Sequence, residues 1–134
     1  MMYLEDVLEL LKGFKLTEHP YMGKLDEKKE NSIGIYNSKH PQAFKTAIGG
    51  PANESYGTKR VKFLIHGSKS LRSTEKTAME LHEKLRDVWD VEAGASKIKF
   101  IQLLNDQPVD VGTDDAGIHE MVIEAVIVYD KKGR

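Results

Sequence analysis

Histidine is the first residue type in this chain that could hold a metal or move a proton. The five histidines lie at positions 19, 40, 66, 82 and 119, and no two have the H-x-x-x-H spacing of a helical metal site. His119 and Glu120 begin like a zinc protease motif, but Ile123 stands where the second histidine belongs. The chain has no cysteine, which excludes disulfides and thiolate zinc sites. We therefore expect no metal and no cofactor, and surface or half-buried histidines.

A run rich in Asp and Gly precedes the last apolar segment and contains Asp110, Gly112, Asp114, Asp115 and Gly117. An EF-hand loop needs glycine at its sixth position and glutamate at its twelfth. A loop starting at Asp110 would instead have Asp115 and Met121 there. Asp and Gly readily adopt turn conformations, so a tight turn explains the run better, with a weak adventitious cation site as the alternative.

Glu120 and Glu124 are expected on one face of a strand and could suggest an acid–base pair. At about 3.3 Å per residue their Cα atoms would be roughly 13 Å apart. Glycosidase carboxylates lie about 5 to 9.5 Å apart, so this pair is too widely spaced. We expect both glutamates on a sheet surface that faces solvent or a lumen.

The run from His66 to Ser70 (HGSKS) precedes a helix and partly resembles a phosphate loop. The Walker pattern requires Gly directly before Lys, but a serine separates Gly67 from Lys69. Helix N-termini attract anions, although helix capping alone accounts for these residues. The chain also has no G-x-S-x-G elbow, and no motif supports catalysis. We expect that the protein is not an enzyme.

Length and composition indicate one domain over residues 1–134. A chain of 15.1 kDa can bury an ordinary core. Its net charge of -1 and pI near 6.5 argue against a dedicated nucleic-acid binder. No window approaches the roughly 20 apolar residues that cross a bilayer, and the acidic N-terminus is unlike a secretory signal. We expect no membrane association and folding in a cytoplasm.

Hydrophobic periodicity predicts the elements. The expected helices cover about residues 2–13 and a segment that Ser73 caps, whose buried stripe is Ala78, Leu81, Leu85, Val88 and Trp89. The expected strands are 16–22, 32–37, 59–66, 98–104 and 118–129. Pro20 confines the first strand to a sheet edge. In the last strand, the residues predicted to face the core are Met121, Ile123, Ala125 and Ile127.

The predicted order is α-β-β-β-α-β-β, an α+β fold. It would be a mostly antiparallel sheet of about four to five strands flanked by two helices. Two loops are expected, 38–58 and 105–117. A polar connection as long as 38–58 is usually functional or disordered.

Three segments together resemble a known family: Ile33 to Gly57, Val61 to Leu85, and Pro108 to Asp130. Their order, spacing and total length resemble the minor capsid or tail-terminator proteins of long-tailed bacteriophages. The resemblance implies a structural virion protein of the tail, assembled in the host cytoplasm. It implies a homo-hexameric ring that caps the tail tube, ends tail polymerisation and joins the head.

The resemblance also implies the partners, which are the tail tube protein, a head-completion or connector protein, and DNA that passes through without specific binding. Loops would supply the two unlike patches of a ring interface. The candidate interface residues are Gly49, Gly50, Asn53, Asp110, Gly112 and Gly117. A lumen through which DNA slides should lack Lys and Arg contacts to phosphate. The candidate lumen-facing acids are Asp114, Asp115, Glu120 and Glu124.

Two other hypotheses remain open. Within phage structure, the chain could be a head–tail connector, a tail-completion subunit or a tail-tube subunit. In a different class, it could be a small ligand-binding module or an enzyme, with the 66–70 turn and nearby histidines as its site. Convergent polar groups in a concave pocket would distinguish the second class.

Overall fold

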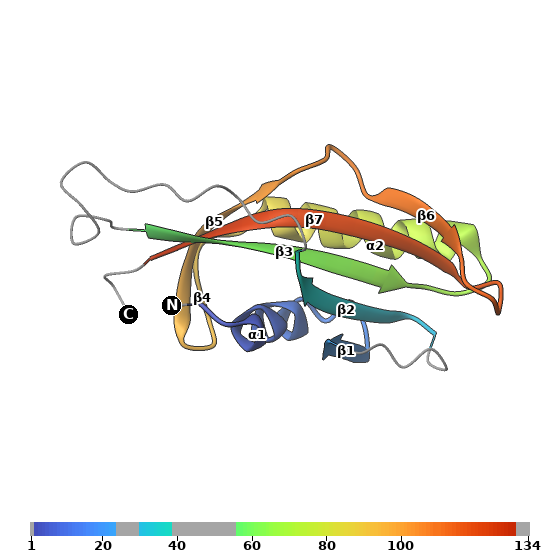
Figure 1. The fold of residues 1–134 in the computed structure, drawn as a ribbon, viewed down its shortest axis with the longest axis horizontal. Coiled ribbons are helices and arrows are strands. Elements are labelled where there is room, and N and C mark those ends of the chain that lie inside the picture. Colours follow the sequence, from blue (N-terminus) through green and yellow to red (C-terminus); the bar gives the residue numbers. More distant parts are fainter. Residues whose placement is uncertain (1, 24–29, 39–55, 131–134) are drawn as a thin grey trace.

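The computed structural model describes residues 2–23, 30–38 and 56–130 (Figure 1). Its two helices are α1 (Leu4–Phe14) and α2 (Leu71–Arg86). Its strands are β1 (His19–Met22), β2 (Ser32–Asn37), β3 (Tyr56–His66), β4 (Trp89–Ala93), β5 (Ser96–Leu103), β6 (Val109–Thr113) and β7 (His119–Asp130).

All seven strands form one sheet in the order β1-β2-β3-β7-β5-β4, with β6 also paired to β7. The two long central strands, β3 and β7, are antiparallel from Tyr56 opposite Asp130 to His66 opposite Glu120. On its other edge β7 pairs with β5 through its C-terminal half and with β6 through its N-terminal end. Strand β7 therefore organises most of the sheet.

The α+β class is confirmed, but the sheet is larger than predicted and partly parallel. The sheet has seven strands, of which β1 and β2 run parallel, whereas a mostly antiparallel sheet of about four to five strands was expected. The two strands that were not predicted are β4 and β6. Trp89 fits the helical stripe by spacing, yet α2 ends at Arg86 and Trp89 opens β4 with 74% of its surface exposed. The predicted edge position of the Pro20 strand is confirmed.

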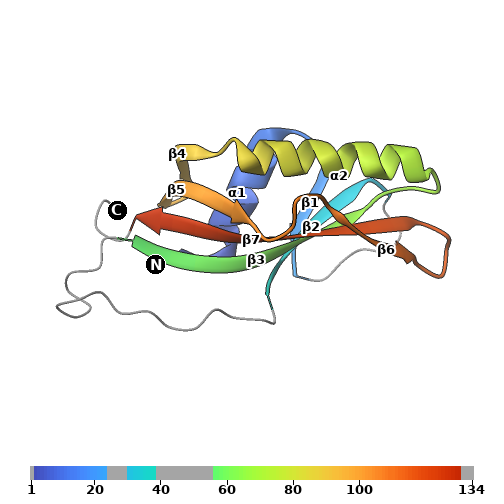
Figure 2. The same cartoon turned by 90° about the horizontal axis from the view of Figure 1, so that it is seen from above.

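Both helices cover the same face of the sheet, as Figure 2 shows. Helix α2 contacts β3, β5 and β7, and α1 contacts β1, β2 and β4. The core between helices and sheet includes the predicted inward-facing residues of β7, together with Phe63, Leu81, Leu85 and Ile98. Alternate side chains of β3 and β7 point to the opposite face, on which no helix of the described residues lies. We call it the helix-free face.

Helix α2 begins earlier than predicted. Its N-cap is Ser70, whose Oγ accepts a hydrogen bond from the Ser73 backbone N–H at 3.2 Å. The predicted cap, Ser73, therefore lies inside the helix. Serines at 68, 70 and 73 all have the side chain that favours a cap, so residue type alone does not choose between them.

A buried carboxylate joins α1 to the β4–β5 turn. Asp6 Oδ1 accepts a hydrogen bond from the Ala95 backbone N–H at 3.0 Å, and Oδ2 accepts from Ser96 Oγ at 2.9 Å and from the Tyr3 backbone N–H at 3.1 Å. Burial by itself raises the pKa of Asp6, but these hydrogen bonds outweigh it and hold the pKa below its usual value.

None of the helices in the described part of the chain has the length and apolar character needed to cross a bilayer.

Candidate functional site

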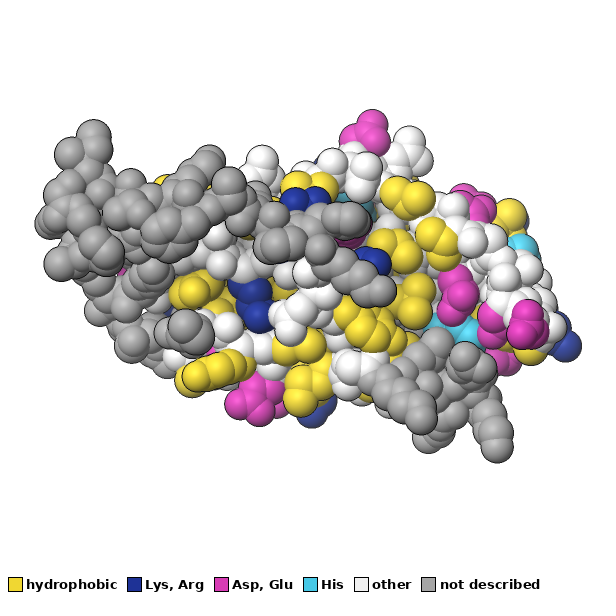
Figure 3. All heavy atoms as spheres, viewed as in Figure 1, with side chains coloured by type: hydrophobic (Ala, Val, Ile, Leu, Met, Phe, Trp, Pro, Cys, Tyr) yellow, Lys and Arg dark blue, Asp and Glu magenta, His cyan; other side chains and the backbone are white. Residues whose placement is uncertain are grey.

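The helix-free face is organised as rows of side chains that cross the strands. Successive residues of a strand point to opposite faces of the sheet. Residues that lie opposite one another in neighbouring strands therefore form a row, to which each strand contributes one side chain. Figure 3 shows hydrophobic side chains gathered between charged ones on the visible surface. The strand register gives the members of each row. The hydrogen bonds and ion pairs of the charged members show which of them already have a contact within the subunit.

One row is apolar and spans five strands. Register aligns its members in the order Tyr21, Gly34, Leu64, Val122 and Val109. Gly34 has no side chain, and the Tyr21 ring occupies the space above it, where a Cβ atom would lie. Burial raises the pKa of the Tyr21 phenol, which therefore stays neutral. The row is a continuous apolar strip across the middle of the face.

A polar row at the end of β3 contains a buried histidine between two acids. His66 is fully buried, and its Nδ1 lies 2.8 Å from Glu120 Oε2. Its Nε2 lies 3.8 Å from Asp114 Oδ2 and has no hydrogen-bond partner. The carboxylates of Glu120 and Asp114 therefore both point toward His66. Asp114 lies in the turn before β7, residues 114–117, which we call the acidic turn, and its contact with His66 holds this turn against β3.

A second charged row centres on Glu124. Its Oε2 lies 3.7 Å from Arg60 Nε and accepts a hydrogen bond from Ser38 Oγ at 3.2 Å. Lys62 stands opposite Glu124 in the register. Glu120 and Glu124 share the helix-free face, as predicted, but they contact different partners, His66 for Glu120 and Arg60 for Glu124.

Asp114 builds the turn that leads into β7. Its Oδ1 accepts hydrogen bonds from the backbone N–H groups of Ala116 and Ile118, both at 2.9 Å. Gly117 supplies a positive φ of 81° in the same turn. These are the hydrogen bonds of an Asx turn, which agrees with the tight turn predicted for this run. Asp115 lies at the tip with its side chain exposed.

Asp110 and Gly112 lie in β6, inside the segment that was expected to be a loop. Asp110 Oδ1 accepts a hydrogen bond from the Gly112 backbone N–H at 2.8 Å. Gly112 has a φ of 95°, and the pairing with β7 shifts register between these two residues. The pair therefore shapes a bulge in an edge strand. The other interface candidates, Gly49, Gly50 and Asn53, lie outside the described residues.

Metal and enzyme hypotheses gain no support from this geometry. Within residues 2–23, 30–38 and 56–130, no group of three or more His, Asp or Glu side chains is placed to hold a metal ion. At the 66–70 turn, Ser68 and Ser70 bond to the local backbone and to each other, as a helix start requires. The candidate functional site is therefore the helix-free face, on which Glu120, Asp114 and Glu124 contact other residues of the same subunit.

Comparison with known families gives this face a context. The sequence profile of the family described as "Bacteriophage tail terminator protein" matches residues 8–131. The chain belongs to this tail terminator family. A search of curated proteins finds no match. The matched segment contains every described strand, so the whole sheet lies within the tail terminator domain. As a tail terminator, the protein is a structural component of the phage tail.

The sequence did not predict the internal partners of the acids in this tail terminator. The contact between His66 and Glu120 joins residues 54 positions apart, and the one between Ser38 and Glu124 joins residues 86 apart. The first depends on the pairing of β3 with β7 and the second also on the pairing of β2 with β3, and no local motif encodes either pairing. Alternation predicted which face each residue takes, but it could not predict the neighbour across the sheet.

Proposed function

We propose that this tail terminator assembles as a homo-hexameric ring on the end of the tail tube, where it stops tube polymerisation and presents a joining surface to the head-completion or connector protein. Its partners are further copies of itself, the tail tube protein and that connector. It acts in the virion tail after assembly in the host cytoplasm, and it has no catalytic role.

The observation that carries the proposal is the family match over residues 8–131. A second observation supports it: within the described part of the chain, one face of the sheet carries no helix and displays an apolar strip between charged rows. Exposed sheet surface of this kind is suited to contacts between subunits. The polar groups at the 66–70 turn are used in local structure, which makes a ligand-binding module or enzyme the weaker hypothesis.

We further propose that Asp114, Asp115, Glu120 and Glu124 give the ring an acidic lumen through which DNA passes without specific binding. The chain has no Lys or Arg between Lys99 and Lys131. A lining from this segment would offer none of the cationic contacts that dominate binding to phosphate. Asp115 contributes most to such a lining because its carboxylate is exposed, whereas the other three acids also have contacts within the subunit.

The interface candidates enter the same proposal. Asp110, Gly112 and Gly117 shape the β6 edge and the turn before β7, and both lie at the surface. Gly49, Gly50 and Asn53 are proposed as further interface residues on the basis of the sequence alone. Two unlike surfaces on one subunit are what a closed ring requires.

Native mass spectrometry and negative-stain imaging, with and without isolated tail tubes, test this function. Six-fold rings, free or on tube ends, are expected at high protein concentration. Self-assembly into long tubes would instead identify a tail-tube subunit, and binding to heads but not to tube ends would identify a connector. A protein that stays monomeric and never binds tube ends would overturn the proposal.

A further inference from the structure

Two exposed apolar patches lie at opposite ends of the long axis of the molecule. The first is the Trp89–Phe100 patch, formed by paired residues of β4 and β5. Their rings stack with centroids 6.3 Å apart and an interplanar angle of 23°. Trp89 is 74% exposed and Phe100 is 39% exposed. A stacked aromatic pair this open to water is the kind of anchor that dominates protein interfaces.

The second is the β6 patch, formed by Val109 and Val111, which are 43% and 53% exposed. All five residues of β6 are exposed, and among the described residues β6 pairs only with β7. Within that part of the chain its other edge is unpaired, and the strand contains no lysine or proline to block pairing. Figures 1 and 2 both place β6 at the end of the sheet away from β4.

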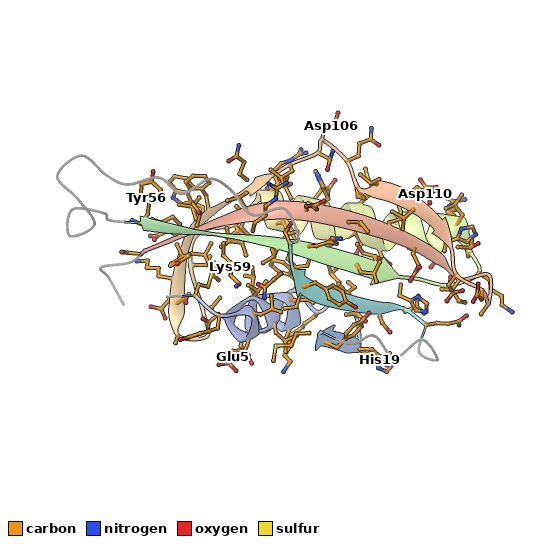
Figure 4. All side chains as sticks on the ribbon, in the orientation of Figure 1. Glu5, His19, Tyr56, Lys59, Asp106 and Asp110 are labelled. Atoms are coloured by element: carbon orange, nitrogen blue, oxygen red, sulfur yellow. The ribbon has the colours of Figure 1, made fainter. Side chains whose placement is uncertain are left out.

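Charge distinguishes the two ends. Asp106 precedes β6 and Asp110 lies within it, between the two valines of the patch (Figure 4), and the surrounding segment contains no Lys or Arg. Near the other patch, Lys97 pairs with Asp90 at 3.3 Å, and Lys99 is exposed beside Phe100. Arg86 adds a further exposed cation at the end of α2. Exposed acids, Asp87, Asp90 and Glu92, lie among these cations, so the rim of the Trp89–Phe100 patch carries charges of both signs. The acidic β6 patch can meet cations there, whereas a second β6 patch would repel it.

We propose that the occupant of the Trp89–Phe100 patch is the β6 patch of a second copy of this chain. Such a contact is heterologous, because each subunit uses a different surface toward each neighbour, and repetition around an axis closes a ring. The inference rests on the proposed ring function and adds the residues that hold neighbouring subunits together. Trp89 is the anchor, Val109 and Val111 form its receptor, and Lys99 lies toward Asp110 across the contact.

Two single variants and their mixture test this arrangement. Trp89→Ser removes the anchor and keeps β6, whereas Val111→Arg damages β6 and keeps the anchor. Each variant alone should need at least about tenfold more protein to assemble than the parent, because losing an interface anchor costs that much or more. Mixed together, the two variants should form 1:1 dimers, since only one productive contact is left and growth then stops.

Met79→Ser is the matched control because Met79 is 44% exposed on α2, away from both patches. It should assemble like the parent, and circular dichroism should show all three variants folded, since each changed side chain is exposed. Rings that form equally well from Trp89→Ser and Val111→Arg would overturn this inference and leave the ring function standing. Loss of assembly in one variant but not the other would also overturn it. A parent protein that forms no ring, alone or on tail tubes, would overturn the proposed function and this inference with it.

Discussion

The Oδ2 atom of Asp6 accepts a hydrogen bond from Ser96 Oγ at 2.9 Å, joining two residues 90 positions apart in the chain. Asp6 lies in the first turn of α1, and Ser96 is the first residue of β5. Both are buried. The contact ties the N-terminal helix to the β4–β5 hairpin that carries Trp89, so α1 supports one end of the proposed subunit interface.

Removing the Asp6 carboxylate should destabilise the protein. Asp6→Ala leaves the Ala95 and Tyr3 backbone N–H groups and the Ser96 hydroxyl without their acceptor, which should lower the free energy of unfolding by about 2–4 kcal/mol. Urea denaturation measures the loss. Glu5→Ala, at the exposed neighbouring position, should change it by less than about 1 kcal/mol. Equal stability of the two variants would contradict a role for Asp6 in holding the helix.

Protonation of Asp6 should reduce stability at low pH. Its pKa in the folded protein lies below the ordinary value of 3.8, so the unfolded chain binds the proton first as pH falls. The contribution of Asp6 is therefore complete above about pH 5 and declines as pH falls through 3.8 toward the lower folded pKa. The stability difference between the parent and Asp6→Asn, measured by urea denaturation from pH 7 to pH 2, should narrow in that window. A constant difference would show that the charge is not involved.

Gly94 should tolerate alanine less well than Gly112. Both have positive φ, 58° and 95°, so alanine strains the backbone at each by about 1–2 kcal/mol. A Cβ atom at position 94 would also collide with the Asp6 carboxylate, whereas one at position 112 would meet no atom within 4 Å. Gly94→Ala should therefore lower the melting temperature clearly more than Gly112→Ala. Similar melting temperatures would mean that Asp6 can move aside at little cost.

The two glutamates of the helix-free face should differ in their contribution to stability. Glu120→Ala leaves the fully buried His66 ring without its hydrogen-bond partner and should cost about 1–3 kcal/mol. Glu124→Ala removes a partly exposed ion pair with Arg60 and should cost about 0–1 kcal/mol. Denaturant titrations of both variants at pH 7 measure the difference. A larger cost at Glu124 would reverse this assignment.

Placing a cation at the tip of the acidic turn should slow DNA passage. Asp115→Lys introduces a phosphate-binding charge into the proposed lumen, while the exposed position leaves folding unaffected. Virions assembled with this variant should eject DNA less efficiently, with a deficit that shrinks as salt rises, because salt screens the added charge. Asp115→Asn serves as the control for loss of the acid alone. Normal packaging and ejection by Asp115→Lys virions would remove Asp115 from the lumen.

The local pattern of apolar and polar residues was sufficient to predict that the two helices exist. It also predicted the strands that have one buried and one exposed face. Apolar and polar residues alternate along β3 and β7, and this alternation correctly predicted that Met121, Ile123, Ala125 and Ile127 enter the core. Strand β6 has no buried residue, so its sequence shows no buried and exposed sides to recognise. Strand β4 was missed because Trp89 continues the spacing of the α2 stripe, although the residue is exposed in a strand.

The sequence by itself therefore determined the α+β class, the family and the side of the sheet on which each residue of β7 lies, because these depend on patterns within a few residues. Only the tertiary structure decided which residues meet. It paired His66 with Glu120, Asp6 with Ser96 and Trp89 with Phe100, and it placed the Trp89–Phe100 and β6 patches at opposite ends. These relationships arise when distant strands pair in one register, and the free energy of that pairing belongs to the whole sheet rather than to any single segment.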